Sequence, residues 1–111
     1  MSEQHDEQAL EGVRLPLEWS VPDDLVSRYA TNMVVQHTKQ EFTVSFFEVR
    51  MPIALGTPEE IKAALQRLGG VKAQCVARVI VAPEHMAEFI AVLQDNLKTY
   101  RASFGEVKSN E

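Results

Sequence analysis

The sequence has little cysteine and histidine. It has one cysteine, Cys75, and three histidines, His5, His37 and His85, which show no metal-ligand spacing among themselves or with Cys75. A single cysteine excludes an internal disulfide framework and fits a reducing compartment. We therefore expect no metal site and no cofactor.

Long apolar runs and clustered basic residues are also missing. No apolar stretch approaches the roughly 18 residues that a membrane-spanning helix needs, and residues 1–11 lack the basic and apolar regions of a secretion signal. The net charge is −5 and the 11 Lys and Arg residues are scattered singly, which disfavours binding to nucleic acid. We expect a cytoplasmic, prokaryotic protein with no membrane partner.

The motifs of common enzyme classes are absent as well. Gly69-Gly70 follows a predicted helix instead of opening one, so it is no phosphate-binding loop, and no serine stands in a nucleophile elbow. The adjacent acids Asp23-Asp24 and Glu59-Glu60 suit a turn and a helix cap, respectively. Cys75 lies on an apolar strand stripe, where a buried thiol is expected to be inert. The sequence predicts no catalytic residue and a non-enzymatic protein.

The 111 residues and the hydrophobic fraction of 45% predict one ordinary globular domain. Residues 1–14 are polar and acidic and predict a disordered tail, 15–105 a single α+β domain, and 106–111 a frayed end. Apolar periodicity predicts strands at 15–21, 31–38, 41–50 and 73–82, and helices at 58–68 and 83 to about 103.

Two features of the predicted sheet depart from the simplest strand pattern. Lys39-Gln40 lacks the Asn-Gly or Asp-Gly chemistry of a tight hairpin, which favours a loop longer than two residues. In the strand 41–50 the apolar positions shift from even to odd numbers after Phe46, so that Phe47 and Val49 become apolar. Either a bulge or a second covered face explains this shift.

The remaining segments carry clear helix signals and one stripe of small residues. Thr57, Pro58 and Glu60 form a capping box with proline in the first turn. One stripe of the last strand is entirely apolar: Ala73, Cys75, Ala77, Val79 and Val81. We expect an α+β fold with an antiparallel meander of three or four strands. The long C-terminal helix packs on one sheet face, and the short helix is inserted before the last strand.

The chain shows a family resemblance in four segments and in the pair Phe104-Gly105 that follows them. The four segments are Tyr29-Ala30-Thr31-Asn32, Glu41-Phe42-Thr43-Val44-Ser45-Phe46, Ala77 to Glu84 and Leu93 to Tyr100. In these the chain resembles the prokaryotic domain-of-unknown-function family 3467 over residues 29–105. It departs from the family pattern at Thr31, which separates Ala30 from Asn32, and at Ala82, where the family has a serine cap. The connection 52–70 is also longer. The resemblance implies the fold and no activity.

The second stripe of the last strand holds the candidate site. Val76 and Ile80 flank Arg78, and with Phe47 and Val49 they form a candidate interface for a subunit or partner. An ion pair of Arg78 with Glu48 or Glu41 is the structural interpretation, and an anion contact at a subunit interface is the functional one. The aromatic residues Trp19, Tyr29 and Phe47 are candidates for a partner-binding patch. Burial in the core or in a dimer is an equally good interpretation of them.

Since one helix covers one sheet face, we expect a homodimer or higher oligomer formed through the second face or a shared edge. The leading hypothesis is a non-enzymatic binding or adaptor protein, in one version a chaperone-like holdase. A nucleic-acid-associated regulator is the alternative. A small enzyme with its site at the subunit interface around Arg78 is the third hypothesis.

Overall fold

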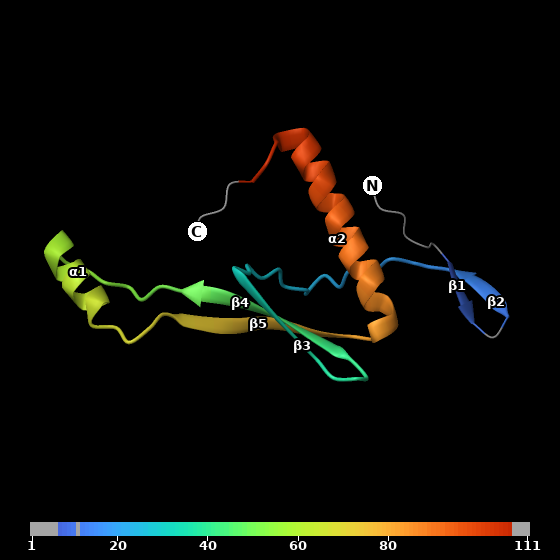
Figure 1. Cartoon of the computed structure of the whole chain (residues 1–111), viewed down its shortest axis with the longest axis horizontal. Coiled ribbons are helices and arrows are strands. Elements are labelled where there is room, and N and C mark those ends of the chain that lie inside the picture. Colours follow the sequence, from blue (N-terminus) through green and yellow to red (C-terminus); the bar gives the residue numbers. More distant parts are fainter. Residues whose placement is uncertain (1–6, 11, 108–111) are drawn as a thin grey trace. The chain divides into compact units, whose positions relative to one another are not determined.

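The computed structural model describes residues 7–10 and 12–107. They form five strands and two helices: β1 (Glu7–Leu10), β2 (Val13–Pro16), β3 (Asn32–His37), β4 (Phe42–Arg50), α1 (Pro58–Gln66), β5 (Lys72–Val81) and α2 (Pro83–Phe104), as Figure 1 shows. The α+β class, the antiparallel meander and the long C-terminal helix are confirmed.

The chain divides into two compact units by its internal contacts, and the single domain 15–105 stays a prediction. One unit contains Met1–Val26 and Pro83–Glu111, and the other contains Ser27–Ala82. In the first unit, β1 and β2 pair as an antiparallel hairpin, with Leu10 opposite Val13. Strand structure therefore begins in the stretch expected to be a tail, where Val13 and Leu15 of β2 alternate with Arg14 and Pro16. Among the predicted segments, His5 and the end of the chain after residue 107 lie outside the described residues.

The helix α2 belongs to the first unit. It begins at Pro83, whose fixed φ suits the first helical turn, and it ends where the Gly105 amide donates to the Arg101 carbonyl at 2.8 Å. Gly105 has φ of +81°, a left-handed conformation that a side chain would strain. No α2 residue is buried in the single chain. Its packing on a sheet face stays a prediction.

The second unit is built on the three-stranded sheet, in the order β3-β4-β5, with both pairs antiparallel. The strands leave four residues, 38–41, between His37 and Phe42, so the loop is longer than two residues, as expected; the Thr38 amide bonds to the Glu41 carbonyl across it at 2.9 Å. The Thr38 hydroxyl accepts a bond from the Gln40 amide at 3.2 Å, which replaces the missing Asn-Gly chemistry.

A β-bulge lies beside the point where the apolar pattern of β4 shifts, but it leaves Phe46 and Phe47 on opposite faces of the sheet, so the shift itself reflects apolar side chains on both faces. Phe46 stands opposite Ala77 but Phe47 stands opposite Cys75, so Val76 is an extra residue on β5. The irregularity is therefore on β5, and β4 alternates without a break. Because side chains alternate along both strands, the odd-numbered residues of β5 before Val76 lie on the opposite face from the odd-numbered residues after it.

The sheet consequently has two mixed faces. We call one the valine face; it carries His37, Val35 and Met33 of β3, Phe42, Val44 and Phe46 of β4, and Val81, Val79 and Ala77 of β5. The other, the arginine face, carries Gln36, Val34 and Asn32, then Thr43, Ser45, Phe47 and Val49, then Ile80, Arg78, Cys75 and Ala73. The predicted apolar stripe of β5 is thus divided between the two faces.

The short helix α1 stands between β4 and β5 in the chain. Its capping box is formed as expected: the Thr57 hydroxyl accepts from the Glu60 amide at 3.2 Å, and the Thr57 amide donates to the Glu60 carboxylate at 3.1 Å. The helix ends at Gln66, before the two glycines, where the Arg67 amide bonds to the Ala64 carbonyl. None of its residues is buried.

Candidate functional site

The arginine face brings together four of the five candidate residues. Phe47 and Val49 on β4 and Arg78 and Ile80 on β5 share this face, while Val76 is the bulge residue beside it. Ile80 is 62% exposed and Val49 is 38% exposed in the single chain. Exposed apolar side chains therefore stand on the same face as the cation Arg78.

The guanidinium of Arg78 is held by a hydroxyl and not by a carboxylate. Its Nε donates to Ser45 Oγ at 3.2 Å, across the row in which Arg78 and Ser45 stand opposite each other. Ser45 is 4% exposed and is one of the two buried residues of the described chain, with Val81. Because Nε is used in this bond, the terminal amino groups of Arg78 are left for another acceptor.

The predicted ion pair of Arg78 with Glu48 or Glu41 was wrong. Glu48 instead contacts Arg50, with 3.2 Å between Oε1 and Nη2. Alternation along β4 places Glu48 on the valine face, opposite Gln74, so the sheet separates it from Arg78. Within residues 7–10 and 12–107, no carboxylate forms a salt bridge with Arg78.

Cys75 does not have the expected environment. It is exposed in the single chain, and the bulge places it on the arginine face, opposite Phe47. Period-two counting along β5 assigned it to the same stripe as Ala77 and Val79, because the count ignored the extra residue Val76. Its thiol contacts the Ala77 carbonyl at 3.5 Å.

The other aromatic candidates are divided between the two units. Trp19 is 70% exposed and belongs to the other unit, whereas Tyr29 is 74% exposed in the unit of the sheet. His37 packs its ring against Phe42 on the valine face, with 5.4 Å between ring centroids. No three His, Cys, Asp or Glu side chains of the described ranges gather as a metal would require.

Sequence reasoning did not single out Thr31 as a structural residue. Thr31 stands just before β3, and its Oγ1 accepts a bond from the Val49 amide at 3.0 Å. Its own amide donates to the Phe47 carbonyl at 2.8 Å. Thr31 therefore joins the start of β3 to β4 on the far side of the bulge. It was visible in the sequence only as an inserted residue in the family pattern.

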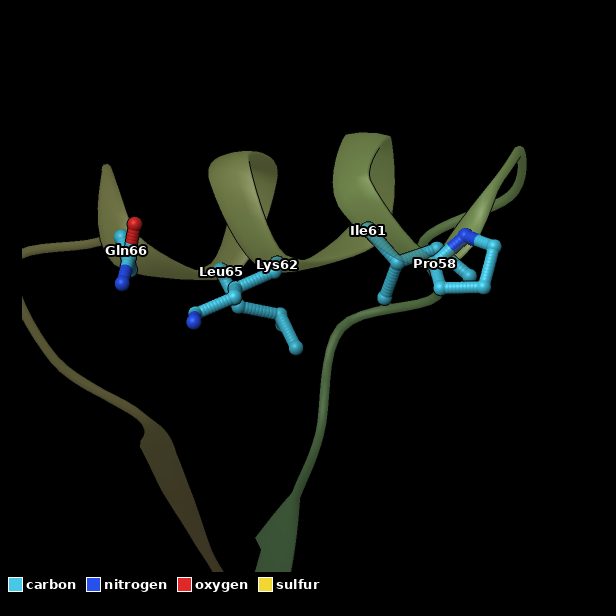
Figure 2. Close-up of a pocket in the computed structure, with 5 residues that line it drawn as sticks. All are labelled: Pro58, Ile61, Lys62, Leu65 and Gln66. Atoms are coloured by element: carbon cyan, nitrogen blue, oxygen red, sulfur yellow. The ribbon is translucent and has the colours of Figure 1, made fainter.

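A shallow hollow lies along α1 (Figure 2), lined by Pro58, Ile61, Lys62, Leu65 and Gln66. All five residues come from this one helix, so no second element closes the hollow. In the same helix, two hydrogen bonds with Thr57 lower the pKa of Glu60. The bond from the Thr57 amide has the larger effect, and the bond with the Thr57 hydroxyl has the smaller one. This hollow has no convergent polar groups that would orient a ligand.

The comparisons with known proteins place the chain in a family. The sequence matches DUF3467, a protein family of unknown function, over residues 1–109. The chain therefore belongs to this family, and the match extends beyond the resembling segments to include β1 and β2. No curated protein and no solved structure matches the chain. Among the described residues, neither helix is both long and apolar enough to cross a membrane.

Proposed function

We propose that this chain is a non-enzymatic, oligomeric adaptor that binds apolar polypeptide segments carrying a carboxylate through its arginine face. The observation that supports this function is the environment of Arg78. Exposed apolar side chains, Ile80 and Val34 among them, share a face with one guanidinium that has a serine as its protein partner.

The sheet's two faces support an assembly of several copies. A helix covers only one face of a sheet, and apolar side chains stand on both faces here. Whichever face is covered within a chain, the other remains for a second copy or a bound segment. A chaperone-like role is one form of this function, since extended apolar segments of unfolded proteins carry the chemistry that the arginine face accepts.

A peptide-binding experiment tests the proposal. Fluorescence anisotropy compares an apolar, extended peptide carrying one central glutamate with the same peptide carrying glutamine. We expect the glutamate peptide to bind about fivefold more tightly at low salt, because a partly exposed charged hydrogen bond contributes about 1 kcal/mol.

The sheet provides a matched control for this experiment. Arg78→Met should remove the preference for glutamate, whereas Arg50→Met should leave it, because Arg50 stands on the opposite face beside Glu48. Equal affinity of the native protein for both peptides, or the same loss in both variants, would overturn the proposal. Light scattering at micromolar concentration tests the assembly separately.

A further inference from the structure

The outer edge of β3 is unusually well suited to pairing with another strand. Within the described chain, β3 pairs with β4 alone, so its other side is an edge of the sheet. Its sequence, Asn-Met-Val-Val-Gln-His, holds no proline, glycine, lysine, arginine or acidic residue, and all six residues are exposed. Soluble proteins usually protect an edge with charges, proline or a bulge.

The second edge of the sheet has such protection. β5 carries Lys72 and Arg78, contains the bulge at Val76 and is separated from Pro83 by the single residue Ala82. The bulge interrupts the regular row of backbone donors and acceptors that a new strand would need. Of the two edges, β3 is therefore the one that can accept a strand.

The backbone groups free on β3 follow from the hairpin. The Thr38 amide bonds to the Glu41 carbonyl, so the even-numbered residues of β3 direct their amides and carbonyls toward β4. Met33, Val35 and His37 then direct theirs to the open edge. These groups are evenly spaced about Val35, the central one, which makes the edge complementary to itself.

We propose that a second copy of this chain pairs with β3 in antiparallel orientation, about a two-fold axis at Val35. Val35 then stands opposite Val35 of the second copy, and Met33 opposite His37. All three outward residues of each copy are satisfied, with about six hydrogen bonds across the edge. A register centred on Val34 would use Met33 and Val35 only, with about four bonds.

The side chains agree with this register and with a second copy as the occupant. The strand contains no carboxylate, lysine or arginine side chain that would repel an identical strand, although the chain as a whole carries −5. On the valine face, the row Val79, Val44 and Val35 continues across the axis into the same three residues of the second copy. Two three-stranded sheets become one sheet of six strands.

This pairing defines the proposed oligomer and therefore rests on the proposed function, and it also predicts how binding sites are arranged. A two-fold axis perpendicular to the sheet keeps the two arginine faces on the same side. The two Arg78 residues are then separated by five strand spacings, about 24 Å across the sheet. A bound segment could contact both arginines if it has carboxylates about seven extended residues apart.

Disulfide trapping tests the pairing and its register. In a Cys75→Ala background, Val35→Cys places two thiols at a pair of positions with Cα atoms about 5.5 Å apart, within the range for a disulfide. Val34→Cys is the matched control. Its two Cα atoms would be about 8 Å apart in this register, too far for a disulfide. We expect mild oxidation to link the Val35 variant at least tenfold more completely than the Val34 variant.

The alternative outcomes are distinct. Preferential linkage of the Val34 variant, or no linkage of either variant in a protein that light scattering shows to be dimeric, overturns pairing through Val35 and leaves the proposed function standing. A native protein that is monomeric at micromolar concentration overturns both. Val35→Pro should abolish dimerisation, because it removes an outward amide that β4 does not use, and Val35→Thr, which keeps that amide, should remain dimeric. A dimeric Val35→Pro variant would contradict the pairing.

Discussion

Thr31 offers the sharpest test of how the sheet is held together beyond its bulge. Its Oγ1 lies 3.0 Å from the Val49 amide, 2.7 Å from Asn32 Oδ1 and 3.3 Å from the Phe47 carbonyl. One hydroxyl has one proton, so it can donate to Asn32 or to Phe47 but not fully to both. The shorter distance favours Asn32, and the hydroxyl accepts from Val49 at the same time.

Thr31→Val replaces the hydroxyl with a methyl group of similar shape and removes both bonds. A hydrogen bond contributes about 1 kcal/mol net, and water can partly replace the lost partner at this exposed position. We therefore expect the free energy of unfolding to fall by about 1–2 kcal/mol. For a chain of this size, that fall corresponds to roughly 4–10 °C in the melting temperature.

Chemical denaturation followed by circular dichroism measures the change, with all variants at one protein concentration because association also stabilises. Thr31→Ser keeps the hydroxyl and is the control, with an expected loss below about 0.5 kcal/mol. If the valine variant is as stable as the serine variant, the hydroxyl bonds do not hold the start of β3 to β4.

Two further predictions concern α1. Thr57→Ala should destabilise this helix by about 1 kcal/mol through loss of the N-cap bond, and nuclear magnetic resonance shifts of residues 58–66 should move toward coil values while those of β4 do not. Because the pKa of Glu60 is lowered in the folded helix, its contribution is present above the carboxyl's ordinary pKa and is lost as pH falls through the lowered value. Helical shifts of α1 should thus weaken on acidification, and Glu60→Gln should weaken that dependence; an unchanged acid profile in this variant would contradict the assignment.

Most elements of the fold were predicted for physical reasons visible in single residues, but the strand expected at 15–21 was wrong, because β2 is Val13–Pro16 and pairs with β1 outside the meander. The box Thr57-Pro58-Glu60 satisfies helix amides locally, so α1 starts where the residues require. Pro83 and Gly105 likewise bound α2. By contrast, the hairpin loop contains a bond from the Gln40 amide to the Thr38 hydroxyl, and this bond has no simple sequence signature.

The candidate face was only partly predictable, because one extra residue changes every assignment after it. A strict period of two placed Cys75 and Ala77 together, whereas Val76 separates them onto opposite faces. The apolar shift at Phe47 could not reveal the bulge, because β4 alternates without a break and the extra residue is on β5. The position of the bulge depends on which residues of two distant segments stand opposite each other.

The unequal lengths of the strands have a consequence for local stability. β3 stands opposite β4 only from Phe42 to Phe47, so residues 48–50 and 72–74 form a ribbon of two strands that leads to α1, in which the Val49 amide bonds to the Thr31 hydroxyl. Isolated two-stranded ribbons are marginal in water, so this end should open and close while the three-stranded part stays folded. Amide protons of the ribbon and of α1 would then exchange with solvent as one group, well before those between Phe42 and Phe46. The protein could thus release the α1 end of its hairpin without unfolding the strands that carry Arg78.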